Sequence, residues 1–255
     1  MKILIAGPGN LGFHIAKRFI ERGNEVFVWH YDTIKLREIG RYLQVPIVEN
    51  LSLWSGDIVF ITVRDDAIRY VSQLIEPSLI KIHCSGALPM NEIATTPRGV
   101  IYPLQSFVKT EPDRWIDIPV FITYEQQSKD VVQHAARILS PKVIEITDEQ
   151  RHKIHLAAVM VNNFVNFTLG MANKYINKEG LSTNWFLPLL NKTVGRFQRG
   201  EDPLAFQTGP ARRHDIKTLN KHLKLLMDTN DQTLYEFYKV VSDIISRYYD
   251  SEKRE

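Results

Sequence analysis

The chain has a single cysteine, Cys84, so no internal disulfide can form and a reducing compartment is indicated. Long apolar runs are missing as well: none approaches the roughly 18 residues of a membrane-spanning helix. Neither sign of charge dominates, with 32 basic and 29 acidic residues, and no basic run with interleaved aromatic residues points to nucleic acid. The first apolar segment lacks the pattern of a signal peptide. We therefore expect a cytoplasmic protein that binds neither nucleic acid nor a membrane and holds no metal.

The 255 residues, of which 44% are hydrophobic, are enough for one large domain or two modest ones. Over residues 1–147, short apolar runs alternate with helical segments, a pattern typical of parallel strands that are covered on both faces. This alternation predicts an α/β fold, a doubly wound Rossmann-like sheet with right-handed crossovers. The expected strands cover residues 3–6, 25–29, 47–48, 57–63, 79–83, 99–102, 120–123 and 143–146, and the expected helices include 33–43, 66–75 and 128–139.

The strand signals stop near Thr147, which has capping-box spacing with Gln150. We therefore expect a dinucleotide-binding domain over residues 1–147 and an all-α domain over 148–255. The last helix carries an apolar stripe, and a domain of this size has little bulk to cover several such faces. This predicts a homodimer through the helical domain, and we expect the charged tail 251–255 to be disordered. The expected helices cover residues 148–177, 184–199, 212–227 and 232–250.

A glycine motif directly follows the first expected strand and opens a helix; it reads Gly7-Pro8-Gly9-Asn10-Leu11-Gly12. A tight strand-to-helix turn leaves backbone N–H groups at the positive end of the helix, where a pyrophosphate can bind. Gly7 would permit the turn, Gly9 would let a phosphate approach the backbone, and Gly12 would let the helix lie close to the strand. A tight turn without a ligand can have the same spacing, but the strand before it and the helix after it favour a dinucleotide site.

The end of the second strand bears on the choice between NAD and NADP. An NAD site usually has an acidic residue there, and in this chain the acid comes late, at Asp32, after His30 and Tyr31. His30, Lys35 and Arg37 could face a 2′-phosphate. Asp32 could instead bind the ribose hydroxyls. We expect NADP(H), with NAD as the alternative. An equally weighted interpretation is that His30 and Tyr31 only line the adenine edge.

Ligands of such sheets bind beyond the carboxyl ends of the strands, so the residues there are further candidates. The backbone at Val63 should pass the cofactor. Asp65 or Asp66 after it could be a functional carboxylate or the N-cap of a helix, and we favour the cap. Ser85, which follows the next strand, could hydrogen-bond the cofactor's carboxamide or the substrate.

Two polar residues lie beyond the strand that Pro103 ends. Gln105 and Ser106 should come near the nicotinamide and could contact the substrate.

The long helix carries His155, Asn162 and Asn163 in an apolar setting. At 100° per residue, His155 and Asn162 are nearly aligned, with Asn163 about 80° away. Such side chains should be partly buried and need partners. A histidine of this kind is usually a satisfied core residue. Facing a cofactor, however, His155 becomes a candidate general acid and Asn163 a candidate orienting amide.

The segment Thr208-Gly-Pro-Ala-Arg-Arg-His-Asp215 contains a Gly-Pro pair that predicts a helix start. Arg212 and Arg213 would then lie in the first turn, where their charges oppose the helix dipole. Positive charges at the start of a helix are unfavourable and bring no evident gain in stability, which points to a functional role. An arginine at that position can bind a carboxylate or phosphate. We therefore predict that Thr208 and Arg213 contact the substrate. The alternative is that both arginines point to solvent and Asp215 offsets their charge.

Taken together, the motifs resemble a family of NADP oxidoreductases with a Rossmann-like N-terminal domain and an uncharacterised helical C-terminal domain. That family is similar to deazaflavin-dependent NADP oxidoreductases, pyrroline-5-carboxylate reductases and 6-phosphogluconate dehydrogenase-like proteins. The resemblance covers nearly the whole chain and implies an NADP cofactor more firmly than any substrate. Its most specific element maps onto Thr208, Gly209, Pro210, Ala211, Arg213 and Asp215. The motifs lie, in order, at residues 7–12, 57–63, 83–86, 102–107, 155–163 and 208–215.

Two departures from the resemblance limit what can be transferred. Many members have His-Pro where this chain has Tyr102-Pro103, so a histidine role cannot be carried over there. The wider superfamily places a lysine four residues before the asparagine of this helix, where this chain has Ala158 and Val159. We expect an oxidoreductase that moves hydride between NADP(H) and a small anionic carbonyl, imine or hydroxy compound in the cleft between the domains. A sensor or scaffold that holds NADP(H) without turnover is the alternative.

Overall fold

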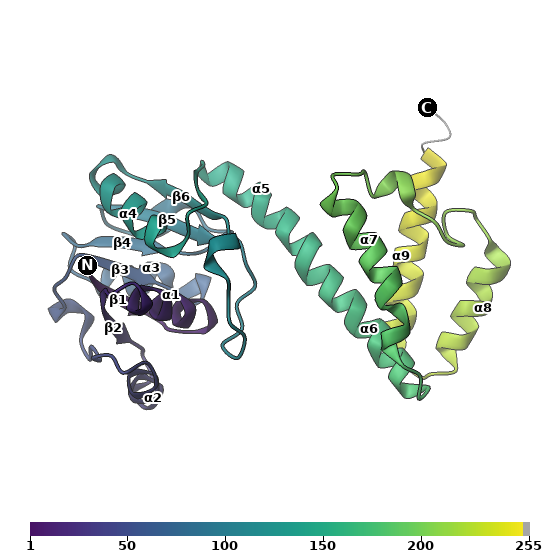
Figure 1. Cartoon of the computed structure of the whole chain (residues 1–255), viewed down its shortest axis with the longest axis horizontal. Helices are drawn as coiled ribbons and strands as arrows, with labels where there is room; N and C mark the ends of the chain where they lie inside the picture. Colours follow the sequence, from purple (N-terminus) through teal and green to yellow (C-terminus); the bar gives the residue numbers. More distant parts are fainter. Residues whose placement is uncertain (252–255) are drawn as a thin grey trace. The chain divides into compact units, whose positions relative to one another are not determined.

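The computed structural model describes residues 1–251 and divides into two compact units, one ending at Val165 and the other beginning at Asn166 (Figure 1). The helix that leads from one unit into the other begins at Asp148, directly after the predicted boundary. The division of roles between residues 1–147 and 148–255 stays a prediction. Of the tail expected to be disordered, Ser251 ends the last helix, and residues 252–255 lie outside the described residues.

A seven-stranded sheet forms the first unit, in the order β2-β1-β3-β4-β5-β6-β7. Strands β1 to β5 are parallel, whereas β6 runs antiparallel to β5. The reversal has a physical cause: only the short 3₁₀ turn η4 (Trp115–Asp117) lies between β5 and β6, and a parallel return normally needs a crossover helix. The expected strand at 47–48 is a single bridge between Val28 and Ile47. The strands are β1 (Lys2–Ala6), β2 (Glu25–Trp29), β3 (Ile58–Ile61), β4 (Ile80–His83), β5 (Arg98–Pro103), β6 (Val120–Tyr124) and β7 (Val143–Glu145).

Helices cover both faces of this sheet. The strands are apolar on both sides, and two buried clusters form, one under α1 and α4 and the other under α3 (Figure 1). In the first cluster Phe19 of α1 packs on Phe60 of β3, with ring centroids 5.3 Å apart. The helices are α1 (Asn10–Glu21), α2 (Thr33–Leu43), α3 (Ile68–Gln73) and α4 (Lys129–Leu139). Sheet and helices confirm the predicted doubly wound α/β class.

The rest of the chain is helical. A continuous helix over residues 148–178 comprises α5 (Asp148–Ala158), the π-helical segment η6 (Val159–Phe164) and α6 (Val165–Lys178). Its predicted capping box between Thr147 and Gln150 is present. The remaining long helices are α7 (Leu187–Gln198), α8 (Ile216–Met227) and α9 (Gln232–Ser251).

The predicted start of the third C-terminal helix at residue 212 is wrong. Helix α8 begins at Ile216, because the Asp215 carboxylate caps it by accepting a hydrogen bond from the Thr218 amide at 3.0 Å. Arg212 and Arg213 therefore precede the helix, so their charges do not lie in its first turn and do not oppose its dipole as predicted.

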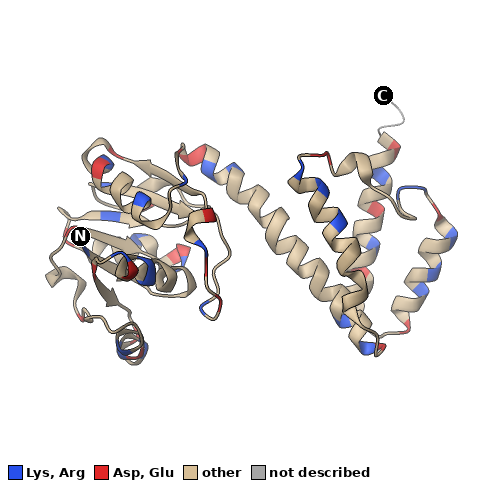
Figure 2. Cartoon of the chain, viewed as in Figure 1, with Lys and Arg blue, Asp and Glu red and all other residues tan. Residues whose placement is uncertain are grey.

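The long helix is free of charge over most of its length. No Asp, Glu, Lys or Arg lies between Lys153 and Lys174 (Figure 2). By length and composition alone this helix could cross a membrane, which the sequence prediction did not foresee. One such helix is weak evidence, and the membrane-free location stays an expectation.

Candidate functional site

The glycine motif forms the turn between β1 and α1. Gly7 has a φ of +88°, and a Cβ there would lie 2.5 Å from Cγ1 of Val63. Gly12 lies against the Thr62 side chain, whose hydroxyl donates to the Gly7 carbonyl at 2.8 Å. These two glycines hold the turn tightly against the end of β3. The space around Gly9 is open, with only the Gly7 carbonyl 3.9 Å from a Cβ placed there.

The start of α1 is open to an anion. Gly9 is its N-cap and offers no side-chain hydrogen bond, and no acidic residue lies in the first turn. Gly9 and Asn10 are exposed, whereas Pro8 is buried and Leu11 is half-buried. Uncapped amides at a positive helix end attract phosphate, so the residues present fit a pyrophosphate.

At the end of β2, His30 and Asp32 hold each other in place. The Asp32 amide donates to Nδ1 of His30 at 3.0 Å, and the His30 ring stacks on Tyr31 with centroids 4.6 Å apart. Asp32 in turn caps α2, because its carboxylate accepts from the amides of Ile34 and Lys35. Burial lowers the pKa of His30. A neutral His30 with Nδ1 accepting keeps Nε2–H free to donate outward.

At the ends of β3 and β4, the predicted cap is wrong and a different contact exists. Neither Asp65 nor Asp66 caps a helix through its side chain. Asp65 instead accepts a hydrogen bond from the Ser85 hydroxyl at 2.9 Å. That hydroxyl also accepts from the amides of Ala87 and Leu88, both at 3.1 Å. Ser85 is therefore engaged in ordering its own loop as well as lying where the cofactor was expected.

A tyrosine and a histidine meet where β5 ends. The Tyr102 hydroxyl and Nδ1 of His155 lie 3.0 Å apart, within hydrogen-bonding distance, and the rings meet edge to face. The backbone of Gly86, which follows β4, lies against both rings. A Cβ at Gly86 would be 2.5 Å from Nδ1 of His155 and 2.9 Å from Cζ of Tyr102. Three elements, β4, β5 and α5, thus converge on one pair of proton-exchanging groups.

A cavity of about 580 Å³ opens beside this pair. It brings together four residues predicted for the site, Gln105, Ser106, His155 and Asn163, with Tyr102. Its lining contains no Lys, Arg, Asp or Glu. The cavity can therefore hold and orient a small molecule through neutral hydrogen-bonding groups and exchange a proton with it.

The π-helical segment places the two asparagines differently from the prediction. Asn162 and Asn163 both line the cavity and are exposed, so the expectation that they would be partly buried is wrong. The segment η6 spans Val159–Phe164, and its backbone hydrogen bonds join residue i to residue i+5. The α-helical rotation of 100° per residue therefore does not apply there, and it does not predict which face each side chain takes. Such turns occur frequently at functional sites.

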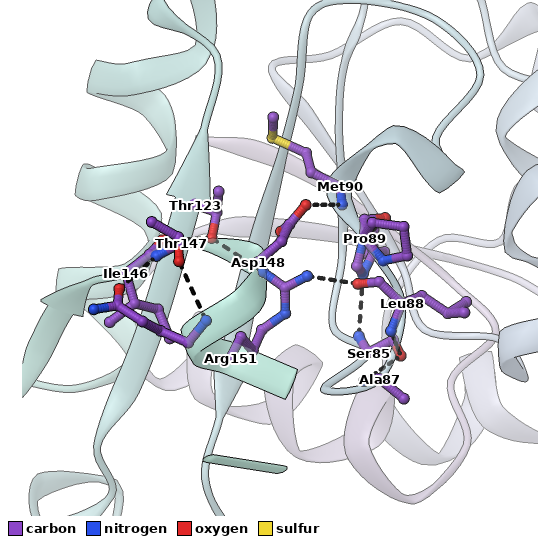
Figure 3. A network of polar contacts seen from close by, with 12 residues as sticks. Ser85, Ala87, Leu88, Pro89, Met90, Thr123, Ile146, Thr147, Asp148 and Arg151 are labelled. Carbon is purple, nitrogen blue, oxygen red and sulfur yellow. Dashed lines mark hydrogen bonds and ion pairs between the residues drawn. The ribbon is translucent and has the colours of Figure 1, made fainter. Parts of the chain in front are cut away.

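Arg151 fixes the start of α5 to the strands (Figure 3). Its side chain is fully buried and forms a 2.7 Å ion pair with Asp148. The guanidinium also donates to the Thr123 hydroxyl at 3.0 Å and to the Leu88 carbonyl at 2.5 Å. Asp148 extends the network by accepting from the Met90 amide at 2.9 Å. His155, one turn further along the same helix, is thereby held at a defined height above β5.

Thr208 and Arg213 belong to the second unit. Arg213 is exposed, whereas Arg212 stacks its guanidinium over the Tyr249 ring, 4.8 Å from the centroid. Arg212 also donates to the Gln207 carbonyl at 2.8 Å. Arg212 is thus engaged in contacts that stabilise the second unit, whereas the side chain of Arg213 remains accessible to a ligand. Their place in one site with His155 stays a prediction.

Comparison with known proteins identifies the family. Residues 118–245 match the sequence profile described as "Domain of unknown function (DUF2520)". The chain belongs to this family. A sequence comparison with curated proteins finds no match.

Members of this architecture have been solved. A "putative NADP oxidoreductase" from Bacteroides fragilis is 27% identical, with a TM-score of 0.84, and the match covers 96% of this chain and 98% of that one. A reductive aminase from Aspergillus terreus, in complex with NADPH and ethyl levulinate, is 14% identical, with a TM-score of 0.69 over 97% and 94% of the two chains. A protein from Thermotoga maritima is 19% identical, with a TM-score of 0.65 over 98% and 99%. The predicted family resemblance and fold class are confirmed.

Sequence reasoning missed two residues of the site, Tyr102 and Gly86. Tyr102 was noted only for what it lacks relative to related proteins, although its place at a strand end on the ligand edge was a usable signal. Gly86 stands in a run of small residues, and nothing in the sequence alone indicates that it faces a histidine more than sixty positions away.

His83 should make the stability of the first unit depend on pH. Burial, assisted by the charge of Arg151, lowers the pKa of His83 to about 4. In the unfolded chain an imidazole titrates near 6.5, so between these values the unfolded state binds more protons. We expect the free energy of unfolding to fall by up to about 3 kcal/mol as the pH drops from about 6.5 to 4. Urea titrations across this range measure the slope.

The control for His83 is a second histidine on the same unit. His83→Gln should lose most of the slope, whereas His134→Gln, at an exposed position on α4, should keep it. Equal slopes in the two variants would show that His83 is not the group responsible.

Proposed function

We propose that this chain is an NADP-dependent oxidoreductase that transfers hydride between NADP(H) and a small anionic carbonyl, imine or hydroxy compound. One observation carries the proposal. The uncapped start of α1 and the Tyr102–His155 pair both lie at the carboxyl edge of the same parallel strands. An anion-binding turn and a proton-exchanging pair at one edge are what hydride transfer with a charged dinucleotide requires.

The solved structures of this architecture support the enzyme class and the cofactor. The relative from Bacteroides fragilis is named a "putative NADP oxidoreductase", and the reductive aminase from Aspergillus terreus was solved with NADPH. An imine reductase from Myxococcus stipitatus was solved with NADP⁺, and a variant of it with NAD⁺. We therefore propose NADP as the cofactor, with NAD possible.

The cofactor would be held by the glycine turn and the neighbouring strand ends. The amides of the turn would bind the pyrophosphate, and His30 with Tyr31 would face the adenosine end. The Asp32 carboxylate caps α2, so it is already engaged and is less suited to bind the ribose hydroxyls of NAD. Lys35 and Lys109 lie close enough to act electrostatically on His30, which supports a site for the 2′-phosphate of NADP. The proposed contacts are Gly7, Pro8, Gly9, Asn10, Leu11, Gly12, His30, Tyr31, Val63 and Ser85.

The remaining residues would act on the substrate. When bound, NADPH supplies a hydride to the substrate carbon. His155 would serve as proton donor or acceptor in the reaction, and Asn163 would orient the reacting group from the cavity wall. Gln105 and Ser106 would contact the substrate there, and Thr208 with Arg213 would bind its anion. No positively charged side chain lines the cavity, which supports the proposal that an arginine from outside the lining binds the anionic group of the substrate.

The experiment that tests this function measures cofactor binding and turnover separately. Titration of NADPH, followed by its fluorescence, should saturate, and NADH should bind more weakly. NADPH oxidation should then exceed background with at least one compound from a panel of oxo acids, cyclic imines and aldehydes. Tight NADPH binding without turnover, together with a partner protein whose affinity depends on NADPH, would favour a sensor instead.

We further propose that the chain acts as a cytoplasmic homodimer through its helical part. Many large apolar side chains of the described second unit are exposed, among them Phe167, Trp185 and Phe197. Exposed apolar area of this extent usually marks an interface. Light scattering should give twice the 29.5 kDa chain mass, and a monomer at micromolar concentration would contradict the proposal.

A further inference from the structure

We propose that Tyr102 is the residue that passes the proton to the substrate, and that His155 reloads it. This assignment rests on the proposed function and deepens it, because it separates the group that touches the substrate from the group that exchanges protons with water. Tyr102 thereby becomes a catalytic residue, and His155 acts through it.

The position of Tyr102 is defined by its strand. It is the next-to-last residue of β5, and its ring lies nearly parallel to Phe121 of β6, with centroids 6.4 Å apart. The side chain is half-buried and lines the 580 Å³ cavity. Tyr102 therefore lines the cavity from a strand, and His155, which lines the same cavity from the helix, lies with Nδ1 3.0 Å from the tyrosine hydroxyl.

Gly86 supplies an independent observation. Its backbone is not in the left-handed region, so no turn geometry requires a glycine there. What requires it is space, because a Cβ would overlap both Nδ1 of His155 and the Tyr102 ring. A side chain at residue 86 would push Tyr102 and His155 apart, and glycine avoids this.

Electrostatics favour a tyrosine in this role. Burial raises the pKa of Tyr102, which keeps its proton in place at neutral pH, while the charge of Arg151 acts in the opposite direction. The buried Arg151 guanidinium therefore stabilises the tyrosinate that remains after the proton has left. Arg151 and His155 are the charged and titratable neighbours on α5, and Phe121 on β6 and Gly86 after β4 carry no charge.

The proton count closes for an imine substrate. With the hydride that NADPH supplies to carbon, the electron pair of the C=N bond moves to nitrogen. Nitrogen takes the proton of the Tyr102 hydroxyl, so an N–H bond forms as the O–H bond breaks. The tyrosinate takes the proton from Nδ1 of His155 while Nε2 takes one from water, which leaves hydroxide and the Nε2–H tautomer. Proton exchange of both ring nitrogens with water then restores Nδ1–H for the next turnover. The same sequence with oxygen in place of nitrogen reduces a carbonyl.

The first test compares two tyrosine variants. Tyr102→Phe keeps the ring and removes the hydroxyl, and we expect kcat to fall by ~10²–10⁴ with the NADPH dissociation constant unchanged. Tyr70→Phe, at an exposed position on α3, is the matched control and should keep both. The rate is measured with glyoxylate, 1-pyrroline-2-carboxylate and 4-carboxybenzaldehyde as probes, each of which carries the anionic group that the proposed function requires. A Tyr102→Phe variant that retains its kcat overturns the assignment.

The pH profile separates Tyr102 from an imidazole donor. If Tyr102 supplies the proton, kcat for reduction should stay level through neutral pH and fall only at or above about pH 10. If an imidazolium were the donor, the fall would come near pH 6.5. A fall at that lower pH overturns the assignment.

A cofactor-free measurement completes the test. In the free protein the ¹⁵N signals of His155 should shift in Tyr102→Phe and in Gly86→Ala but not in Tyr70→Phe, because only the first two disturb the contact. Unchanged signals in all three overturn the pairing. A wild-type protein that binds no NADPH would overturn the proposed function, whereas binding and turnover that survive in Tyr102→Phe would overturn this assignment alone.

Discussion

Replacement of Gly9 by aspartate should weaken NADPH binding about 10²–10³-fold and leave the fold intact. At an effective dielectric constant of 20, two unit charges about 4 Å apart repel each other by roughly 4 kcal/mol, and salt reduces this value. The carboxylate would lie at the start of α1, where the proposed pyrophosphate binds and no acidic residue now stands. Fluorescence titration with NADPH measures the change.

The control for Gly9 is asparagine, which has nearly the same shape and no charge. Gly9 has a φ of −69°, and a Cβ there meets only one carbonyl at 3.9 Å, so both variants should unfold at the wild-type temperature. Gly9→Asn should lose about tenfold at most, through crowding alone. Equal losses in the two variants would mean that no phosphate lies near this turn.

Replacement of Arg151 by methionine should destabilise the first unit by about 3–4 kcal/mol. Removing one partner of a buried ion pair leaves the other without compensation. Here the loss also strips a hydrogen bond from the Leu88 carbonyl and one from the Thr123 hydroxyl. Asp148 is about one-third exposed and keeps its bond to the Met90 amide, which places the cost toward the lower end of the usual range. Urea unfolding, followed by amide hydrogen exchange in the strands, gives the value.

Arg69→Met is the matched control for Arg151. Arg69 forms a 2.9 Å ion pair with Glu92, but its side chain is 54% exposed. Exposed pairs contribute less than about 1 kcal/mol, so this variant should be close to wild type. Similar losses in both variants would show that burial of Arg151 adds nothing to its ion pair.

The parts of the fold that follow from local pattern were predictable. Strand β2 and helix α2 have the predicted bounds, because the patterns of an apolar strand and of a capped amphipathic helix depend only on residues that are consecutive in the sequence. The capping box at Thr147 is equally local. The reversal of β6 was missed, since strand direction depends on the connection before it and not on the strand's own residues.

The site was predictable residue by residue but not as an arrangement. His155 could be singled out from its helix, yet its partner Tyr102 is 53 positions earlier, and only the fold brings them together. Asp215 was considered as a neutraliser of charge, whereas it caps α8 and moves the two arginines out of the helix. In each case a side-chain hydrogen bond determined where the residues of the site lie, and the hydrophobic periodicity of the sequence does not reveal such bonds.

The π-helical turn makes one short stretch of the long helix tolerant of a change in chain length. A turn closed from i to i+5 holds one residue more than an α-helical turn, so deleting Met160 would let it close from i to i+4. The side chains on either side would keep their faces. The same deletion within α6 would rotate every later residue by about 100°. The loss of a single residue is therefore most easily accommodated beside Asn162 and Asn163, where it would change the polar groups that line the cavity.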